Sequence, residues 1–170
     1  MDTKATRDRT LSVGSGHHDW YTADFPRQYL VLRRFAAAVC DLDMDPDDVL
    51  QDALAATLRA ESNGATVEDH ASYVKRAILS RVQSERRSLA RRVTRRRPDA
   101  APDQVDQYPS DLSGLLELVA PRDRALLYLT IVEGMTSSEA GQCLGMASVA
   151  VRVGAHRARR RFASRFKEDG

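Results

Sequence analysis

The C-terminal part of the sequence carries positive charge with no opposing acid. From Ala140 to Lys167 there is no Asp or Glu, and arginines fill the stretch. The basic side chains are Arg152, Arg157, Arg159, Arg160, Arg161, Arg165 and Lys167, with His156 among them. Arginine suits nucleic acid because its planar guanidinium donates paired hydrogen bonds to a phosphate or a guanine edge. A solvated basic face is the alternative interpretation, and the elements that carry the run decide between the two.

Those elements have the layout of a helix-turn-helix. Thr136 and Glu139 are three residues apart, the spacing of a capping box that starts a helix. The short helix predicted there ends at Gly145, and a final helix begins near Ser148. A capped short helix, a glycine turn and a basic second helix form the arrangement in which the second helix enters the DNA major groove. The sequence therefore predicts a DNA-binding helix-turn-helix between about residues 118 and 166.

A cluster of acids lies in the first half of the chain. Its members are Asp41, Asp43, Asp45, Asp47, Asp48 and Asp52. Asp45 is placed to cap a helix that begins at Pro46, and the carboxylates that follow favour the positive end of the helix dipole. Because such a surface repels phosphate, we expect it to face a protein. Helix-capping carboxylates with no further role are the other interpretation.

Helical periodicity dominates the first block, and no strand pattern competes with it. Apolar faces are predicted for one helix from Phe25, a second from Pro46 to the Asn63-Gly64 stop, and a longer third after Asp69. The first face comprises Tyr29, Leu32, Ala36, Val39 and Cys40, and the second Val49, Leu50, Ala53, Leu54, Thr57 and Leu58. The third comprises Tyr73, Val74, Ala77, Ile78, Arg81 and Val82, and that helix ends in Arg86, Arg87, Arg91, Arg92, Arg95, Arg96 and Arg97.

The second block repeats this helical pattern. A helix is predicted to begin at Pro121, run through Val132 and end at Gly134. The final helix is expected to use Val149, Val151, Val153, Ala155, Ala158 and Phe162 as its apolar positions. The predicted fold class is all-α, with two small helical modules joined by a flexible linker and a helix-turn-helix in the second.

Composition divides the chain into four segments. Residues 1–22 are polar and irregular and are interpreted as a flexible arm, and residues 23–97 form the first helical domain. Residues 98–112 hold prolines and acids without Lys or Arg, which indicates a linker, and residues 113–170 form the second domain.

Several functions lack support in the sequence. No phosphate-binding glycine loop, nucleophile elbow or HExxH pair is present, so an enzyme is not expected, and neither is a cofactor. No metal site is expected, because the pair His17 and His18 has no further ligands nearby and Cys40 and Cys143 are better read as small buried hydrophobes. Without an apolar run long enough to span a bilayer, we expect no membrane insertion and a cytoplasmic location.

Together these blocks resemble the extracytoplasmic-function (group 4) sigma factors of bacterial RNA polymerase, within the sigma-70 family. The segment from Asp45 to Leu54 is similar to that family's acidic helix, and Tyr73 to Ile78 to the helix that usually begins Trp-Leu. The pattern is followed most closely from Leu118 to Phe162, including Glu133-Gly134-Met135-Thr136 and the His156-to-Arg159 ending. The resemblance covers roughly residues 25–97 and 113–166.

The resemblance implies a function and specific contacts. It implies a sigma factor, with regions 2 and 4 in the two domains, that binds core RNA polymerase through its β′ clamp helices and β flap and recognises −10 and −35 promoter DNA. An anti-sigma factor is a further expected partner. Residues implied for polymerase binding are Asp48, Gln51 and Asp52. Those implied for the −10 element are Tyr73, Arg76, Ser80, Gln83 and Arg87, together with the loop from Asn63 to Asp69. Those implied for the −35 element are Ser148, Val149, Arg152, His156, Arg157, Arg159 and Arg160.

The sequence departs from the family's pattern at four positions in or beside these sites. Tyr73 stands where the family usually has Trp, and Ser80 replaces a frequent Asn, which affects capture of an unstacked base. Ala150 and Gly154 replace the usual Thr and a common Arg or Ser, which affects −35 preference. Two alternatives therefore remain open. One is a stand-alone helix-turn-helix regulator, and the other is a sigma-like interaction protein without initiation activity.

Overall fold

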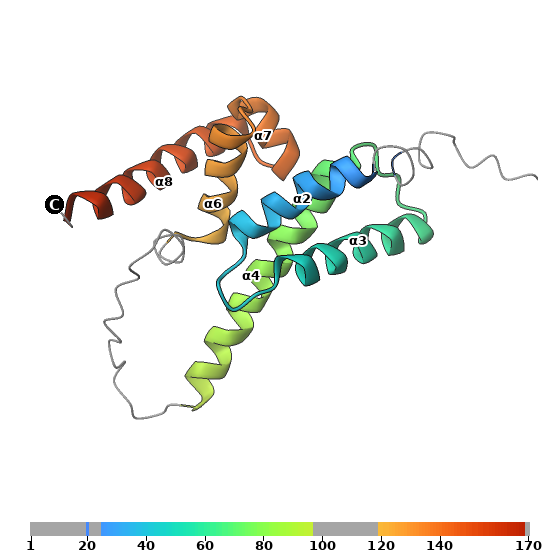
Figure 1. The fold of residues 1–170 in the computed structure, drawn as a ribbon, viewed down its shortest axis with the longest axis horizontal. Coiled ribbons are helices and arrows are strands. Elements are labelled where there is room, and N and C mark those ends of the chain that lie inside the picture. Colours follow the sequence, from blue (N-terminus) through green and yellow to red (C-terminus); the bar gives the residue numbers. More distant parts are fainter. Residues whose placement is uncertain (1–19, 21–24, 97–118, 169–170) are drawn as a thin grey trace, which may run out of the picture.

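The computed structural model describes Trp20 and residues 25–96 and 119–168, and within these ranges every regular element is a helix (Figure 1). The elements are α2 (Phe25–Val39), α3 (Pro46–Ser62), α4 (His70–Arg96), α6 (Pro121–Leu127), the π-helical turn η1 (Tyr128–Val132), α7 (Ser137–Leu144) and α8 (Ser148–Glu168). The predicted all-α fold class is confirmed. The predicted arm, apart from Trp20, and the predicted linker lie outside the described residues.

The start and end of α3 follow from its sequence. The Asp45 side chain accepts a hydrogen bond from the backbone N–H of Asp47 at 2.8 Å, and Pro46 occupies the first turn. At the other end Asn63 is the C-cap, and Gly64 takes the left-handed conformation with φ of +90°. A residue with a Cβ is strained there, so glycine ends the helix at little cost. The predicted limits of this helix are confirmed.

Helices α2, α3 and α4 pack together as the first module, residues 25–96. Leu32, Leu50 and Ile78 are fully buried where the three helices meet. Phe35 is also fully buried, although it lies outside the face predicted for α2. Its ring meets Tyr128 of η1 edge to face, with ring centroids 5.6 Å apart. The buried face of α2 is wider than predicted because α2 packs against a second group of helices as well.

Helices α6, η1, α7 and α8 form the second module, residues 119–168. The helix predicted from Pro121 to Val132 forms, but its last turn is a π-helix in which the N–H of Glu133 donates to the carbonyl oxygen of Tyr128 at 3.0 Å. Gly134, with φ of +67°, ends it as predicted. Ile131, which lies in this turn, is exposed.

Helix α8 buries one narrow face. Val151, Ala155 and Ala158 are buried, as predicted, whereas Val149 and Val153 are exposed at 56% and 41%. Assigning these two valines to the apolar face was therefore wrong. Each lies two residues from Val151, about 200° around the helix, so a helix that buries Val151 and Ala155 turns both valines away from the core.

The two modules pack against each other and share one contiguous hydrophobic core. Helix α2 contacts α6, and α4 contacts both α6 and α7. Two cations are buried at this contact. Lys75 of α4 bonds both carboxylate oxygens of Glu133 at 2.7 and 2.5 Å, and Arg124 of α6 pairs with Asp41, which follows α2.

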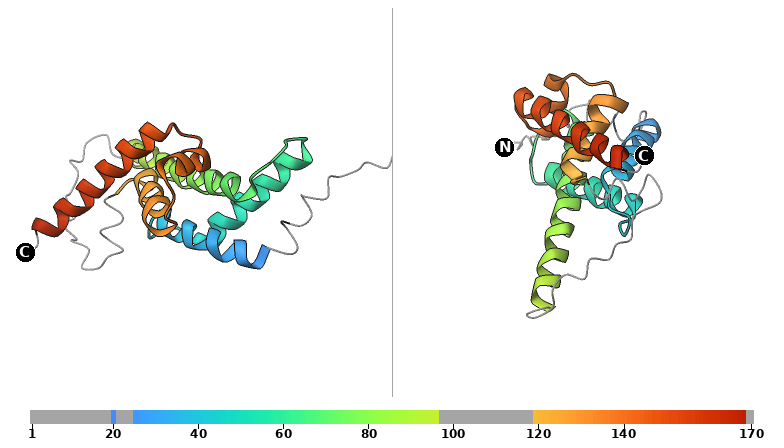
Figure 2. Two further views of the ribbon diagram at one scale, coloured as in Figure 1. Left: turned by 90° about the horizontal axis from the view of Figure 1, so that it is seen from above. Right: turned by 90° about the vertical axis from the view of Figure 1, so that its left-hand side faces the viewer.

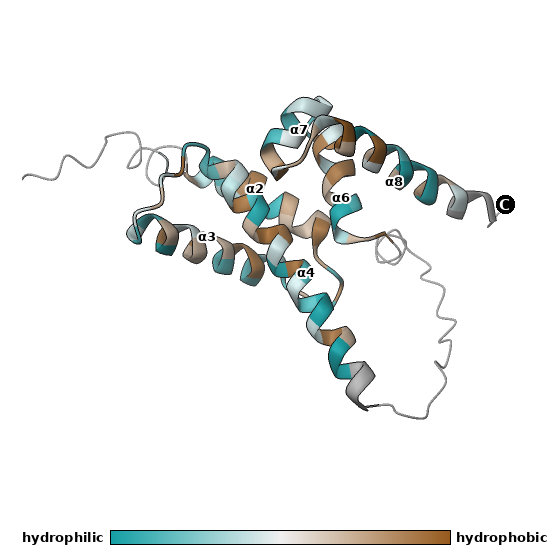
Figure 3. Ribbon diagram, turned by 180° about the vertical axis from the view of Figure 1, so that it is seen from behind, coloured by the Kyte–Doolittle hydropathy of each residue, from teal (hydrophilic) through white to brown (hydrophobic). Residues whose placement is uncertain are grey.

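Both long basic helices extend beyond this core. The C-terminal half of α4 projects to one side of the molecule and that of α8 to another (Figures 1 and 2). Apolar residues gather where the helices meet, whereas the outer half of α8 is mainly hydrophilic (Figure 3). None of the described helices combines the length and the apolarity needed to cross a membrane.

The turn of the helix-turn-helix leaves no room for a side chain at Gly141. A Cβ atom built there lies 2.6 Å from the backbone oxygen of Met146 and 3.5 Å from the backbone nitrogen of Ser148. Because backbone must move to make room, we predict that Gly141→Ala lowers the free energy of unfolding. Overpacking costs about 1–3 kcal/mol, and the better helix propensity of Ala offsets at most about 1 kcal/mol.

Urea unfolding at equilibrium measures the change in the free energy of unfolding of Gly141→Ala. Gln142→Ala, at an exposed neighbouring position, is the control, and equal stability of the two variants contradicts the prediction.

Candidate nucleic-acid interface

The first helix of the helix-turn-helix is fixed by reciprocal hydrogen bonds at its start. The hydroxyl of Thr136 accepts from the backbone N–H of Glu139 at 3.2 Å. The Glu139 carboxylate accepts from the backbone N–H and the hydroxyl of Thr136 at 2.8 and 2.7 Å. The bond from the Thr136 backbone, followed by that from its hydroxyl, holds the pKa of Glu139 below its ordinary value. At the other end Gly145 turns the chain with φ of +67°. The predicted capping box and glycine turn are confirmed.

All the side chains predicted for the −35 element are exposed on α8. They are Ser148, Val149, Arg152, His156, Arg157, Arg159 and Arg160. The opposite face holds the buried Val151, Ala155 and Ala158, so the core fixes how α8 is rotated. Val149 and Val153 are exposed and line a groove that α8 shares with Leu126 of α6, and exposed apolar side chains near Arg152 suit the methyl group of thymine. The arrangement supplies both a guanidinium and apolar contacts for reading base edges.

Gly154 has a structural explanation in the packing of α8 on α6. A Cβ built at Gly154 lies 2.6 Å from Cδ1 of Leu126, whose side chain is 1% exposed. The small residue therefore lets α6 approach α8 closely. A side chain at position 154 would point toward α6, and its absence leaves room for Leu126.

The residues predicted to bind polymerase lie together on α3. Asp48, Gln51 and Asp52 are exposed, and their i, i+3, i+4 spacing puts them on one face of the helix. Asp52 pairs with Arg81 of α4 at 3.1 Å, and both side chains are more than two-fifths exposed. An exposed pair of this kind contributes little to stability, which leaves Asp52 available to a partner.

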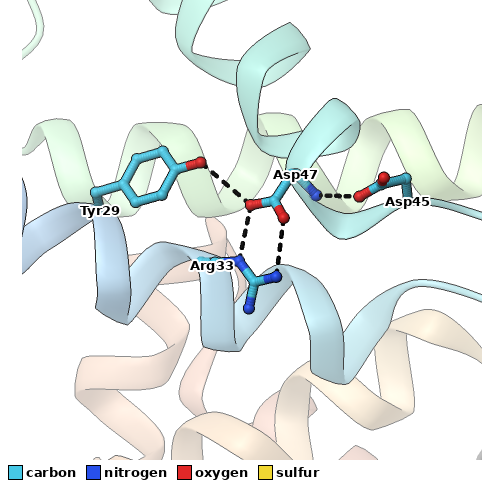
Figure 4. A network of polar contacts seen from close by, with 4 residues as sticks. All are labelled: Tyr29, Arg33, Asp45 and Asp47. Carbon is cyan, nitrogen blue, oxygen red and sulfur yellow. Dashed lines mark hydrogen bonds and ion pairs between the residues drawn. The ribbon is translucent and has the colours of Figure 1, made fainter.

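Other members of the acidic cluster are used within the fold. Arg33 of α2 holds both carboxylate oxygens of Asp47 at 2.8 Å, and the Tyr29 hydroxyl donates to the same carboxylate at 3.1 Å (Figure 4). The bond to Arg33 is the main reason that the pKa of Asp47 is lowered. Asp45 caps α3, and Asp41 pairs with Arg124 and, at 3.3 Å, with Arg86. Capping and pairing within the fold therefore account for Asp41, Asp45 and Asp47, whereas contact with a partner protein stays a prediction for the exposed Asp48 and Asp52.

The residues predicted for the −10 element all lie on α4, but their surroundings differ. Ser80 and Arg87 are exposed and Gln83 is half-buried. Nearer the start of the helix, the guanidinium of Arg76 lies over the ring of Tyr73, 5.7 Å from its centroid. Arg76 also reaches the second module, where it donates to the carbonyl oxygens of Cys143 at 2.9 Å and Gln142 at 3.4 Å, at the end of α7.

The loop from Asn63 to Asp69 is anchored at its C-terminal side. Val67 is buried, and the Asp69 carboxylate accepts from the backbone N–H and the hydroxyl of Ser72 at 3.0 and 2.6 Å. His70 is buried and lies 2.7 Å from a carboxylate oxygen of Glu61. The indole of Trp20 stacks on the His70 ring with centroids 5.0 Å apart. One aromatic residue of the predicted arm thus lies beside the loop expected to meet the −10 element.

The cysteines and the remaining ionisable groups offer no separate chemical centre among the described residues. No three His, Cys, Asp or Glu side chains in residues 25–96 and 119–168 converge as metal ligands would. Cys40 and Cys143 are buried, as predicted, and burial raises the pKa of the Cys40 thiol to about 11. At neutral pH that thiol stays protonated, and the thiol is a far weaker nucleophile than the thiolate.

No family model matches the sequence, but comparison with known proteins finds relatives that carry the same name. Two proteins called RNA polymerase sigma-E factor are each 31% identical to this chain. The one from Streptomyces coelicolor matches over 140 residues, covering 78% of this chain and 77% of its own length. The one from Streptomyces avermitilis matches over 137 residues, covering 78% and 76%.

A solved structure shares the fold across both modules. The sigma factor RpoE of Bartonella quintana, solved in complex with the anti-sigma factor NepR, superposes with a TM-score of 0.65. The match covers 89% of this chain and 99% of that chain, at 18% identity. The level of identity to the Streptomyces proteins, sustained over most of both lengths, shows that this chain belongs to the extracytoplasmic-function sigma factors of RNA polymerase.

Proposed function

We propose that this sigma factor binds core RNA polymerase through the outer face of α3, recognises −35 DNA through α8, and recognises −10 DNA through α4. The observation that carries the proposal is the pairing, within one fold, of an exposed basic recognition helix with an exposed acidic face. Asp48, Gln51 and Asp52 remain directed outward although neighbouring aspartates are used in the fold. A regulator that binds only DNA has no need for such a face, because it repels phosphate.

Each surface is assigned a partner by its chemistry. The acidic face of α3 suits a basic protein surface, for which the polymerase β′ clamp helices are the proposed partner. An apolar groove of about 320 Å³ lies between the second module and Ala38 of α2, lined by residues that include Leu127, Ile131, Val132 and Phe162. An apolar lining favours a protein side chain over a phosphate, and the β flap is the occupant we propose. The RpoE structure contains an anti-sigma factor, which supports a similar inhibitor for this chain.

Reconstituted transcription tests the proposal as a whole. Purified chain and core RNA polymerase are combined with a promoter library in the absence of any inhibitor, and promoter-specific transcripts are expected. Binding to DNA without any transcript or polymerase binding supports a stand-alone regulator instead. Binding to polymerase without promoter opening supports a sigma-like interaction protein.

Arg152→Ala is predicted to weaken binding to a −35 duplex. The guanidinium is exposed on the outer face of α8, and loss of one bidentate base contact costs about 1–3 kcal/mol, or roughly 5- to 150-fold in affinity. Fluorescence anisotropy at fixed salt measures the change, because phosphate contacts make affinity strongly salt-dependent. Arg27→Ala, which removes an exposed arginine of α2, is the matched control and should leave the affinity unchanged. If both variants bind like the wild type, the recognition helix has been assigned wrongly.

Asp48→Arg is predicted to weaken binding to core polymerase by about tenfold or more, because it places a like charge against the basic partner surface. Binding to the isolated −35 duplex should be unchanged, since Asp48 is exposed on α3 in the other module. Asp43→Arg makes the same charge change at an exposed position outside the proposed face. Equal loss of polymerase binding in both variants would mean that overall charge, and not the α3 face, governs the interaction.

A further inference from the structure

The loop between α3 and α4, residues 63–69, is closed at its base by a pair of polar side chains. Glu61 lies in the last turn of α3 and His70 is the first residue of α4, so the two residues flank the loop. A carboxylate oxygen of Glu61 lies 2.7 Å from Nε2 of His70, and the two side chains are only 16% and 6% exposed. A polar contact shielded from water in this way is stronger than the same contact at the surface. The pair therefore joins the two ends of the loop.

Backbone and side-chain hydrogen bonds fix the loop on either side of its tip. The N–H groups of residues 63–65 donate to carbonyl oxygens in the last turn of α3 at 2.9 to 3.2 Å. On the other side Val67 is buried, and the Asp69 carboxylate accepts two hydrogen bonds from Ser72. Thr66, between these anchors, is exposed. The loop thus presents an exposed tip from fixed ends.

Trp20 covers the pair at the base of the loop. Its indole stacks on the His70 ring with centroids 5.0 Å apart and an angle of 20° between the planes. Trp20 also meets Phe25 edge to face at 5.8 Å, and the ring of Phe25 lies 5.9 Å from that of Tyr29. A row of three aromatic rings therefore runs from α2 to the base of the loop. The stacked indole shields the contact of His70 from water and restricts rotation of the imidazole.

We infer that Trp20, His70 and Glu61 form a brace that positions the 63–69 loop for recognition of the −10 element. The inference rests on the proposed assignment of this region to −10 DNA. An unstacked base binds more tightly to a loop whose conformation is already fixed, because the complex then loses less entropy on forming. The brace thus adds a residue from outside the helical module, at position 20, to the determinants of −10 recognition. All three act as positioning residues.

The brace makes a separate prediction for its two outer members. Trp20→Ala uncovers the contact between His70 and Glu61, and Glu61→Ala removes that contact. Either change lowers the fraction of chains whose loop has the binding conformation, and apparent affinity falls with that fraction. Trp20→Phe keeps an aromatic ring on the imidazole, and Glu61→Gln keeps an oxygen that accepts a hydrogen bond from it. Each conservative variant should therefore restore most of the affinity that its Ala counterpart loses.

Hydrogen exchange of the full-length chain, followed by mass spectrometry, tests the brace directly. For Trp20→Ala and Glu61→Ala we expect the amides of residues 63–65 to exchange about two- to tenfold faster, the range for loss of one aromatic contact or one hydrogen bond. Exchange in α8 should keep its wild-type rate, which separates a local effect from a general loss of stability. Leu30→Ala, which shortens an exposed apolar side chain of α2 outside the aromatic row, is the matched control. Wild-type exchange of the loop in both Ala variants overturns the inference.

Binding of a single-stranded −10 oligonucleotide to the chain in complex with core polymerase tests the positioning role. The oligonucleotide carries the −10 sequence selected in the transcription assay, and a scrambled sequence measures non-specific binding. Trp20→Ala and Glu61→Ala should each lower the ratio of the two affinities by about two- to tenfold, and Trp20→Phe and Glu61→Gln should restore most of it. A residue that only stabilises the fold leaves this ratio unchanged. Because both residues act through His70, the double Ala variant should lose less than the product of the two single losses.

The outcomes separate this inference from the proposed function. Faster exchange of the loop with an unchanged ratio of affinities overturns the positioning role. Losses that multiply in the double variant contradict a single brace. A wild-type complex that prefers no −10 sequence contradicts the proposed function and the inference together. A wild-type preference that both Ala variants retain in full contradicts the inference alone.

Discussion

The burial of Lys75 and Arg124 imposes the tightest requirement on this structure. Removing an ammonium or a guanidinium from water costs several kcal/mol unless a well-placed carboxylate and hydrogen bonds compensate. Glu133 and Asp41 supply that compensation, and each stands in the opposite module from the cation that it neutralises. The contact of Phe35 with Tyr128 adds apolar packing beside these ion pairs. The buried charges therefore require that the two modules meet with each cation opposite its carboxylate.

The aspartates of the first module fall into two groups, those that stabilise the fold and those that stay exposed on the proposed binding face. Asp45 caps α3, and Asp47 ties α3 to Arg33 and Tyr29 of α2. These bonds hold the helix in place, so that Asp48 and Asp52 project from a rigid support. A rigid support matters for recognition, because a partner then pays little entropy to order the groups that it contacts. Under the proposed assignment of this face to polymerase, the structural aspartates contribute to binding without touching the partner.

Local signals in the sequence predicted the limits of most helices, and the side chains predicted for the −35 element are exposed on α8. The capping box of Thr136 and Glu139, the cap at Asp45 and the stops at Gly64, Gly134 and Gly145 all depend on residues within a few positions of one another. Features that depend on distant residues were missed. Phe35 is buried by Tyr128, and Lys75 is paired with a glutamate 58 positions away, so no local pattern marks either of them. The π-helical turn likewise follows from no residue in its own sequence.

Helix α4 contributes both to the packing of the first module and to the proposed −10 site. Its buried side carries Val74, Ile78 and Val82, which the first module needs in order to fold, and its distal half projects into solvent. The first two turns of α4 carry residues of both the contact between modules and the proposed −10 site. Lys75 belongs to the contact, and the adjacent Arg76 belongs to the proposed site. Adjacent residues on a helix diverge by about 100°, so one can be buried at the contact while the other lies at its edge. The second module therefore occupies part of the segment that is proposed to bind −10 DNA.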